Sequence, residues 1–299
     1  MKYILQTKEL TKVYSMKKAV DNVSLTVKPG DIYGFVGKNG AGKTTFIRMI
    51  LGLTRATQGS CSFFDGAGDA GDRRRIGSLV ESPALYKNLS ARQNLELYCI
   101  MTGSDRASAD GLLELVGLSD TGKKRVADFS LGMKQRLGIA MALVADPEFL
   151  VLDEPINGLD PKGIVEIREL LLDLNRKGKT IFISSHILGE LEKIATCYGI
   201  ISSGRLVEEI TARQLQEMSM ERTMINTDSP EKARKIAAGI LGSDNLAIEN
   251  GILCVSKKIP NIGELTNEMF KNGIIVSGIT SDNGGAEEYF LRKMEEGQS

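Results

Sequence analysis

The pattern of hydrophobic and polar positions divides the chain into two stretches of different character. Up to about residue 220, short and wholly apolar runs alternate with segments of helical period. The runs at 32–36, 149–152 and 181–183 have no charged residue, which is typical of strands buried on both faces of a parallel sheet. The pattern therefore predicts an α/β domain over residues 1–220 and a separate small domain over residues 221–299.

Within the first stretch, the period of the pattern changes twice. Short strands bounded by turn signals are predicted at 4–7, 12–14 and 23–27, and the alternation in the last of these indicates an antiparallel, half-buried strand. From about residue 82 to residue 145 the period is helical, with helices expected near 94–101 and 112–116 and a third that opens at Ser130. An antiparallel β subdomain and a helical subdomain over 82–145 are thus expected beside the parallel sheet.

The second stretch has its own order of elements. A strand is predicted at 222–228, a helix that ends at Leu241, a hairpin at 246–256 turning at Asn250-Gly251, a helix at 262–271 and a strand at 274–280. A last helix is expected at 287–296. The order βαββαβ is that of a ferredoxin-like α+β domain. Because it holds no catalytic constellation, we interpret it as an accessory domain.

Composition narrows the class of protein. The chain has 299 residues, of which 42% are hydrophobic, and its 38 basic and 38 acidic residues cancel. That balance gives no basic field for nucleic acid, so we expect none as a partner. The four cysteines form no C-x-x-C pair, which argues against a metal site or a disulfide framework and favours reduced cytosolic thiols.

Membrane and targeting signals are weak in this sequence. The N-terminal residues lack the apolar core of a secretory signal. The longest apolar run, 137–145, is far shorter than the roughly 20 residues that a membrane span needs. Any membrane role is therefore expected to come through a partner.

A glycine-rich segment follows the apolar run at 32–36 and precedes a predicted helix over 45–51 that stops at Gly52. Residues 37–44 have the spacing G-x-x-x-x-G-K-T of a phosphate-binding loop, in which backbone N–H groups point inward. The lysine supplies a charge for the β- and γ-phosphates, and the first threonine supplies a hydroxyl for Mg²⁺. An ordinary glycine-rich turn is the alternative. The residues expected to hold a nucleotide here are Gly37, Asn39, Gly40, Ala41, Gly42, Lys43, Thr44 and Thr45.

Polar residues follow two other predicted strands where those strands end. Asp153 and Glu154 end the apolar run at 149–152, at the edge where parallel sheets bind ligands. An aspartate there can hold Mg²⁺, and the adjacent glutamate can polarise an attacking water. The only histidine, His186, ends the next strand and is expected to hydrogen-bond to the γ-phosphate or to that water. Carboxylates that merely end a strand, and a structural histidine, are the alternatives.

Two further features have both a functional and a structural interpretation. Tyr14 lies on a polar segment before the glycine-rich loop and could stack on an adenine, or it could be a partly buried sheet tyrosine. The three arginines at 73–75 could clamp phosphate, but a solvated turn is the better interpretation.

Taken in order, these segments resemble the ATP-binding subunit of an ABC transporter over about residues 2–220. The resemblance implies that 37–44 is the Walker A motif, that 149–153 is the Walker B motif, that Glu154 is the catalytic glutamate and that His186 is the switch histidine. It further implies that Ser130 and Gly132 belong to the signature motif, that Asp160 ends the D-loop and that Tyr14 takes the adenine-stacking position. ATP and Mg²⁺ are the implied ligands, with Thr44, Asp153 and Glu81 on the metal.

The sequence departs from the family pattern in two places. Leu131 and Met133 replace a glycine and the glutamine of the usual L-S-G-G-Q signature. Glu81 takes the place of the Q-loop glutamine, which adds a negative charge that faces the phosphates. With the small C-terminal domain, these features look like the bacitracin-resistance and lantibiotic-immunity branch of ABC exporters.

In such proteins the signature of one subunit closes over nucleotide held by the P-loop of another. One P-loop and one signature therefore imply two chains, in the simplest case a homodimer, and a polytopic permease driven through the region 81–89. The chain would sit peripherally at the cytoplasmic face of the membrane. A soluble ABC ATPase acting on ribosomes or DNA, and a monomeric P-loop kinase or ATPase, remain as alternatives.

Overall fold

The structure, a computed structural model, describes residues 1–66, 72–218, 222–243, 245–256, 259–282 and 285–297. The described chain forms two compact units, one of residues 1–212 together with the residues from Arg292 on, the other of residues 213–291. The first boundary lies at 212/213, whereas the sequence predicted it at 220/221. In addition, the residues from Arg292 on belong to the first unit and not to the second. The reason is that the last turn of the C-terminal helix packs onto two strands of the first unit.

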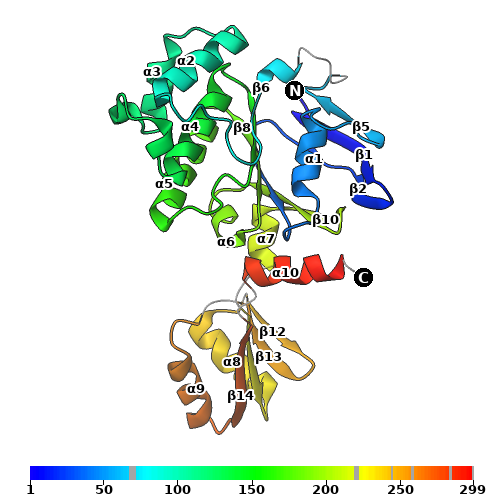
Figure 1. Ribbon diagram of the computed structural model, residues 1–299. Helices are drawn as coiled ribbons and strands as arrows, with labels where there is room; N and C mark the ends of the chain where they lie inside the picture. The colour runs from blue at the N-terminus through cyan, green and yellow to red at the C-terminus, as the bar shows by residue number, and fades with distance from the viewer. Residues whose placement is uncertain (67–71, 219–221, 244, 257–258, 283–284, 298–299) are drawn as a thin grey trace. The chain divides into compact units, whose positions relative to one another are not determined.

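A six-stranded sheet, counted over the described residues, forms the centre of the first unit (Figure 1). β4 (Ile32–Val36), β7 (Phe149–Asp153) and β8 (Thr180–Ser185) are buried at every position, as strands covered on both faces must be. The strand order is β10-β9-β4-β8-β7-β6, in which only β10 runs antiparallel to its neighbour. The remaining strands are β6 (Ile76–Leu79), β9 (Cys197–Ser202) and β10 (Arg205–Thr211).

An antiparallel sheet of four described strands lies at one side of the first unit, and helices lie at the other (Figure 1). The sheet contains β1 (Leu5–Tyr14), β2 (Lys17–Val23), β3 (Thr26–Val27) and β5 (Gln58–Phe63). The helices at the other side are α2 (Ala91–Thr102), α3 (Ser108–Leu115), α4 (Leu131–Leu143) and α5 (Pro161–Arg176). The expected β subdomain and helical subdomain are therefore both present.

The core of the first unit explains why the loops at the strand ends are rigidly placed. Phe35 of β4, Phe46 of α1 (Lys43–Ile50) and Phe182 of β8 are fully buried, with ring centroids 4.9–6.0 Å apart. These ring contacts fix helix α1, which follows the glycine-rich loop, against strands β4 and β8. Shorter elements among the described residues of this unit are α6 (Leu188–Leu191) and the 3₁₀ helices Asp72–Arg75, Ser119–Thr121 and Val126–Asp128.

The arginines at 73–75 lie in the first of these 3₁₀ helices. Arg73 and Arg74 are exposed, whereas Arg75 stacks on Phe64 and makes a bidentate pair with Glu148. The solvated-turn interpretation fits the first two arginines, and Arg75 has a structural role.

The second unit contains the element order expected from the sequence. Its antiparallel sheet has the order β12-β13-β11-β14 over the described residues, and α8 and α9 bury Ala233, Ala237, Leu265 and Met269 against it. The strands are β11 (Arg222–Thr227), β12 (Leu246–Glu249), β13 (Ile252–Val255) and β14 (Val276–Asp282). The helices are α7 (Ala212–Met218), α8 (Pro230–Leu241), α9 (Ile262–Lys271) and α10 (Ala286–Glu296), the last of which ends in the first unit.

Candidate nucleotide site

The glycine-rich loop joins β4 to α1 and cannot be built without its glycines. A Cβ at Gly37 would lie 2.5 Å from the carbonyl oxygen of Ile201, and one at Gly42 would lie 2.5 Å from that of Ala19. Gly42 also has φ 109°, a conformation that other residues avoid. The loop is therefore packed tightly against strands β2 and β9, with its shape fixed before any ligand arrives.

The open N-terminus of α1 points out of this loop. Its N-cap residue, Gly42, offers no side chain to the N–H groups of the first turn. Such groups, with the positive end of the helix dipole, bind anions. The phosphate-binding interpretation of residues 37–45 thus has a physical basis in the fold.

Lys43 is held in place from both sides of the loop. It is only 6% exposed, and its Nζ donates to the carbonyl oxygens of Gly37 at 2.7 Å and Lys38 at 3.3 Å. Its Nζ also lies 3.1 Å from Glu154 Oε1, a buried oxygen that has no partner with hydrogen-bond geometry in the described structure. The contact between Lys43 and Glu154 is therefore mainly an attraction of charges, which an anionic phosphate can replace.

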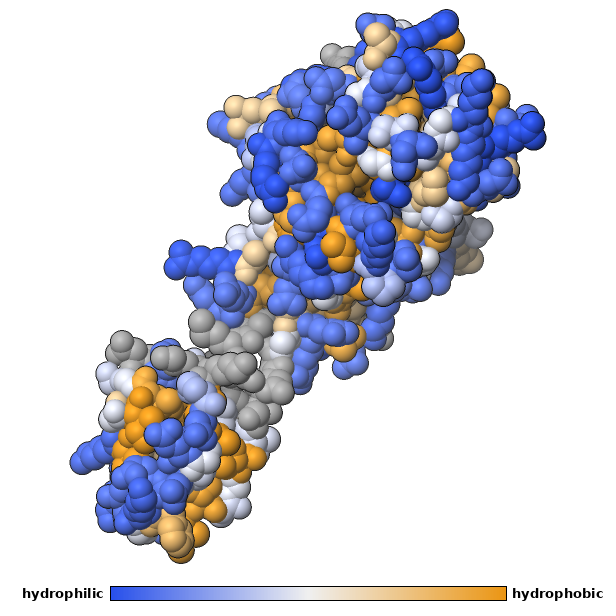
Figure 2. All heavy atoms as spheres, turned by 90° about the vertical axis from the view of Figure 1, so that its left-hand side faces the viewer, coloured by the Kyte–Doolittle hydropathy of each residue, from blue (hydrophilic) through white to orange (hydrophobic). Residues whose placement is uncertain are grey.

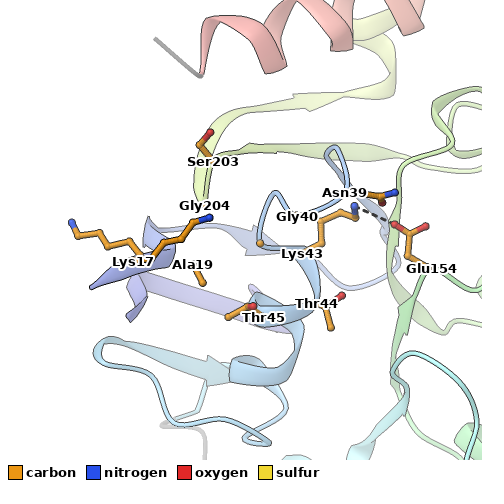
Figure 3. Close-up of a pocket in the computed structure, with 12 residues that line it drawn as sticks. Lys17, Ala19, Asn39, Gly40, Lys43, Thr44, Thr45, Glu154, Ser203 and Gly204 are labelled. Atoms are coloured by element: carbon orange, nitrogen blue, oxygen red, sulfur yellow. Dashed lines mark ion pairs between the residues drawn. The ribbon is translucent and has the colours of Figure 1, made fainter. Parts of the chain in front are cut away.

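A cavity of about 490 Å³ opens over the loop (Figure 3). Figure 3 shows Lys43 and Glu154 pointing toward each other at one end, while Lys17 and Ala19 of β2 and the turn Ser203-Gly204 line the rest. The loop residues that line it are Asn39, Gly40, Gly42, Lys43, Thr44 and Thr45. Gly37 and Ala41 do not line the cavity. Gly37 packs against Ile201, and Ala41 is only 7% exposed, so both support the loop from the protein interior.

The wall formed by Lys17, Lys18, Ser203 and Gly204 was not expected from the sequence. These residues come from β2 and from the turn between β9 and β10, far from the glycine-rich loop along the chain. The adjacent Lys17 and Lys18 were the only sequence signal for this wall, because a pair of cations favours an anionic ligand.

The carboxylates and the histidine meet beside Lys43, as their positions at strand ends predicted. Strand β8 lies between β4 and β7, so its carboxyl end adjoins both. His186 Nδ1 lies 2.8 Å from Glu154 Oε2. Ser184 Oγ donates to Asp153 Oδ1 at 2.5 Å and accepts from the Glu154 N–H at 3.0 Å. Glu154 itself has φ 50°, a conformation that costs about 1 kcal/mol or more outside glycine.

Two other expected site segments lie apart from this cavity but next to each other. Ser130 caps α4 by accepting from the Met133 N–H at 3.2 Å, and Asp160 caps α5 by accepting from the Gly163 N–H at 3.1 Å. A Cβ at Gly132 would lie 3.8 Å from Leu159. Neither Ser130 nor Asp160 lines the cavity of this chain.

Tyr14 and Glu81 also lie outside the lining of the cavity. Tyr14 ends β1, is 46% exposed, and has Lys12 Nζ 4.9 Å from its ring centroid. Glu81 follows β6 with φ 59°, and its Oε1 lies 2.7 Å from Arg48 Nη2 of α1. Stacking by Tyr14 and metal binding by Glu81 therefore stay predictions.

The residues present fit a magnesium ion. Thr44 and Asp153 offer hard oxygen donors of the kind that Mg²⁺ prefers, and α1, which carries Thr44, lies against β7, which ends on Asp153. The described part of the chain has no cluster of three or more His, Cys, Asp or Glu side chains that could hold a metal alone. A bound Mg²⁺ would thus depend on phosphate and water oxygens as well.

Fold and site together define a P-loop nucleotide-binding protein in which Glu154 and His186 lie beside the phosphate loop. The model of the ABC transporter family matches residues 20–157. The chain is 43% identical to the bacitracin transport ATP-binding protein BcrA of Bacillus licheniformis, covering 98% of this chain and 97% of that one. It is 44% identical to the lantibiotic transport ATP-binding protein SrtF of Streptococcus pyogenes, over 69% of this chain and 90% of that one.

Solved structures agree with these sequence relatives. The ATP-binding subunit of an ABC transporter superposes with a TM-score of 0.64 at 30% identity, covering 71% of this chain and 92% of that chain. A dimeric ATP-binding cassette, bound to ADP and phosphate after hydrolysis, has a TM-score of 0.64 at 26% identity, over 70% and 99% of the two chains. The protein belongs to the ABC transporter ATP-binding family.

Membership of this family establishes ATP hydrolysis as the general activity. The chain is an ATP-binding protein of a family that hydrolyses ATP and whose transport members work with membrane permease components. A membrane-spanning helix is not found among the residues that the structure describes.

Proposed function

We propose that this chain hydrolyses ATP to drive a membrane permease that exports antimicrobial peptides or related amphiphiles. The observation that best supports ATP hydrolysis is the line of side chains Lys43, Glu154 and His186. Lys43 Nζ lies 3.1 Å from Glu154 Oε1, and His186 Nδ1 lies 2.8 Å from Glu154 Oε2. The choice of cargo rests on the bacitracin and lantibiotic transport proteins to which the chain is similar over most of its length.

Each residue of this line has a separate task. Lys43 exchanges its contact with Glu154 for the β- and γ-phosphates when nucleotide enters. Glu154, released from Lys43, accepts a proton from the attacking water, while His186 holds the carboxylate through Nδ1. We expect His186 to hydrogen-bond to the γ-phosphate or to that water once nucleotide is bound. Ser184 fixes the backbone at Glu154 and the carboxylate of Asp153, so both acids keep their positions.

Magnesium would be held by the Thr44 hydroxyl and the Asp153 carboxylate. When bound, Mg²⁺ neutralises charge that develops on the phosphate oxygens. Glu81 Oε1 is paired with Arg48, so this ion pair competes with any metal for that oxygen.

A second copy of the chain completes the site. Ser130 and Gly132 begin α4 away from the cavity of their own chain, with Ser130 exposed to solvent. The N-terminus of α4 is therefore available to bind the γ-phosphate held by another chain, as α1 is for its own. We infer a homodimer with two equivalent sites.

The permease contact is assigned to the segment 81–89 and the adjoining face of α2. Asn94 holds this segment to α2, since it accepts from the Tyr86 N–H at 2.8 Å and donates to the Tyr86 carbonyl at 3.1 Å. Figure 2 faces the side on which α2 to α5 lie and shows apolar surface between polar side chains. Large apolar side chains exposed on this segment and on α2 are Tyr86, Leu97, Ile100 and Met101.

The proposal places the chain at the cytoplasmic face of the membrane, bound through the permease and not to nucleic acid. The test is to express the chain together with a polytopic permease encoded beside it, once one is identified, in a sensitive bacterium and to measure inhibitory concentrations of bacitracin and of a lantibiotic. We expect resistance to rise with the wild-type chain and not with Lys43→Ala. Unchanged sensitivity to both peptides, with chain and permease both present in the membrane fraction, would refute the export role.

A further inference from the structure

The turn between β9 and β10 forms one wall of the nucleotide cavity and is bonded to the phosphate loop. Ser203 and Gly204 line the cavity and have φ 50° and 81°, as in a two-residue hairpin. The Gly204 N–H donates to the Ala41 carbonyl at 2.9 Å, and the Gly204 carbonyl accepts from the Asp21 N–H at 2.7 Å. This turn therefore bridges the phosphate loop and β2 through two backbone hydrogen bonds.

The last turn of α10 is docked on the strand that leads into this turn. Ser202, the last residue of β9, is 3% exposed, and its Oγ donates to the Met294 carbonyl at 2.7 Å. Met294 lies in the last turn of α10, where helix carbonyls have no partner within the helix. Ser202 thus satisfies one of these carbonyls, and it lies next in sequence to the cavity wall.

Packing and charge hold the same helix end. A Cβ at Gly297 would lie 2.5 Å from Val207 Cγ2 and 3.0 Å from Ser202 Cβ, so the chain passes directly over the hairpin. Lys293 Nζ lies 3.5 Å from Glu208 Oε2 of β10. Three separate contacts therefore fix residues 293–297 to β9 and β10, all within the first unit.

We propose that the last turn of α10 is a positioning element for nucleotide binding, which acts through Ser202 on the Ser203-Gly204 turn and so on the phosphate loop. Its residues touch no nucleotide. Because α10 begins at Ala286 in the second unit and ends in the first, the accessory unit has a covalent route to the cavity. A force that displaces α10 lowers nucleotide affinity.

The test uses the full chain with two substitutions that loosen the contact by different means. Ser202→Ala removes the hydroxyl, and Gly297→Val forces the helix end away from Val207. We expect the Kd for ADP and the KM for ATP to rise roughly 3- to 10-fold in Ser202→Ala, the range set by the loss of one buried hydrogen bond, with kcat within about twofold. Gly297→Val should raise both constants in the same direction. Amide exchange at Gly204 should accelerate in both variants.

The matched control is Ser277→Ala, which removes a hydroxyl that donates to the Asn226 carbonyl in the second unit. It should leave both constants and the exchange at Gly204 as in the wild type. An unchanged Kd for ADP in Ser202→Ala and Gly297→Val would overturn the proposal. So would a fall in kcat that parallels the loss of affinity and a lowered Tm, since that result indicates general destabilisation.

Discussion

Replacing Glu154 by glutamine isolates the catalytic role of its carboxylate. Glutamine has the same length, so it can keep the contact with His186, and Lys43 keeps its hydrogen bonds to the carbonyls of Gly37 and Lys38. The fold and the phosphate loop should therefore be unchanged. The proton-accepting group is lost, and only the chemical step is affected.

The expected loss of rate follows from the role of Glu154 as general base. General-base assistance is worth about 10²- to 10⁴-fold in rate, or roughly 3–5 kcal/mol of barrier. The variant also removes a negative charge 3.1 Å from the Lys43 ammonium, which competes with phosphate for that ammonium. ATP should consequently bind as tightly as to the wild type or more tightly, although turnover nearly stops.

The assay is steady-state phosphate release, with ATP affinity measured separately by equilibrium dialysis. Glu169→Gln is the matched control, because Glu169 lies on α5 with its side chain 58% exposed and should turn over normally. A Glu154→Gln chain that hydrolyses ATP within threefold of the wild type would refute the assignment of the general base.

Three other changes have outcomes that the structure sets. Asp21→Asn should cost about 1 kcal/mol at pH 7, because Lys18 and Arg205 lower the pKa of Asp21 by hydrogen bonding. That stability is present above the unfolded pKa near 3.8 and is lost as pH falls through the lower folded pKa, so the two unfolding curves should converge once the pH lies below that folded pKa. Glu81→Gln should keep ATPase activity but alter its coupling to export, and a variant equal to the wild type in both assays would remove any special role for Glu81. Gly77→Ala should destabilise by about 1–3 kcal/mol or more in thermal melts, because its Cβ would lie 2.1 Å from the Ala142 carbonyl oxygen, and an unchanged Tm would contradict the packing of β6 against α4.

The central site could be predicted from the sequence because each of its parts is local. Glu154 and His186 directly follow strands β7 and β8, and Lys43 follows β4 across the glycine-rich loop. Parallel strands bring such residues to one edge of the sheet. The order of elements in the second unit was predictable for the same reason, since turn signals such as Asn250-Gly251 mark its boundaries.

Features that depend on distant pairing could not be predicted. The strands expected at 4–7 and 12–14 are one strand, β1, because irregular register near Glu9 lets it pair with β5 by one part and with β2 by another. The polar residues between them resemble a turn. Likewise, no local pattern shows that Gly204 bonds to the phosphate loop or that α10 ends on β9.

We propose that a second copy of the chain completes each ATP site, and a mixing experiment tests this proposal. Lys43→Ala disables the phosphate loop, while Gly132→Asp places a negative charge in the signature at a position where a Cβ meets only Leu159, at 3.8 Å. Each variant alone should be inactive as an ATPase.

In an equal mixture, half of the dimers pair one variant with the other, and each such dimer holds one intact site. We expect the mixture to recover up to about a quarter of the wild-type ATPase rate. A mixture that stays as inactive as its two components, with mixed dimers shown to form, would contradict an ATP site completed by a second copy of this chain.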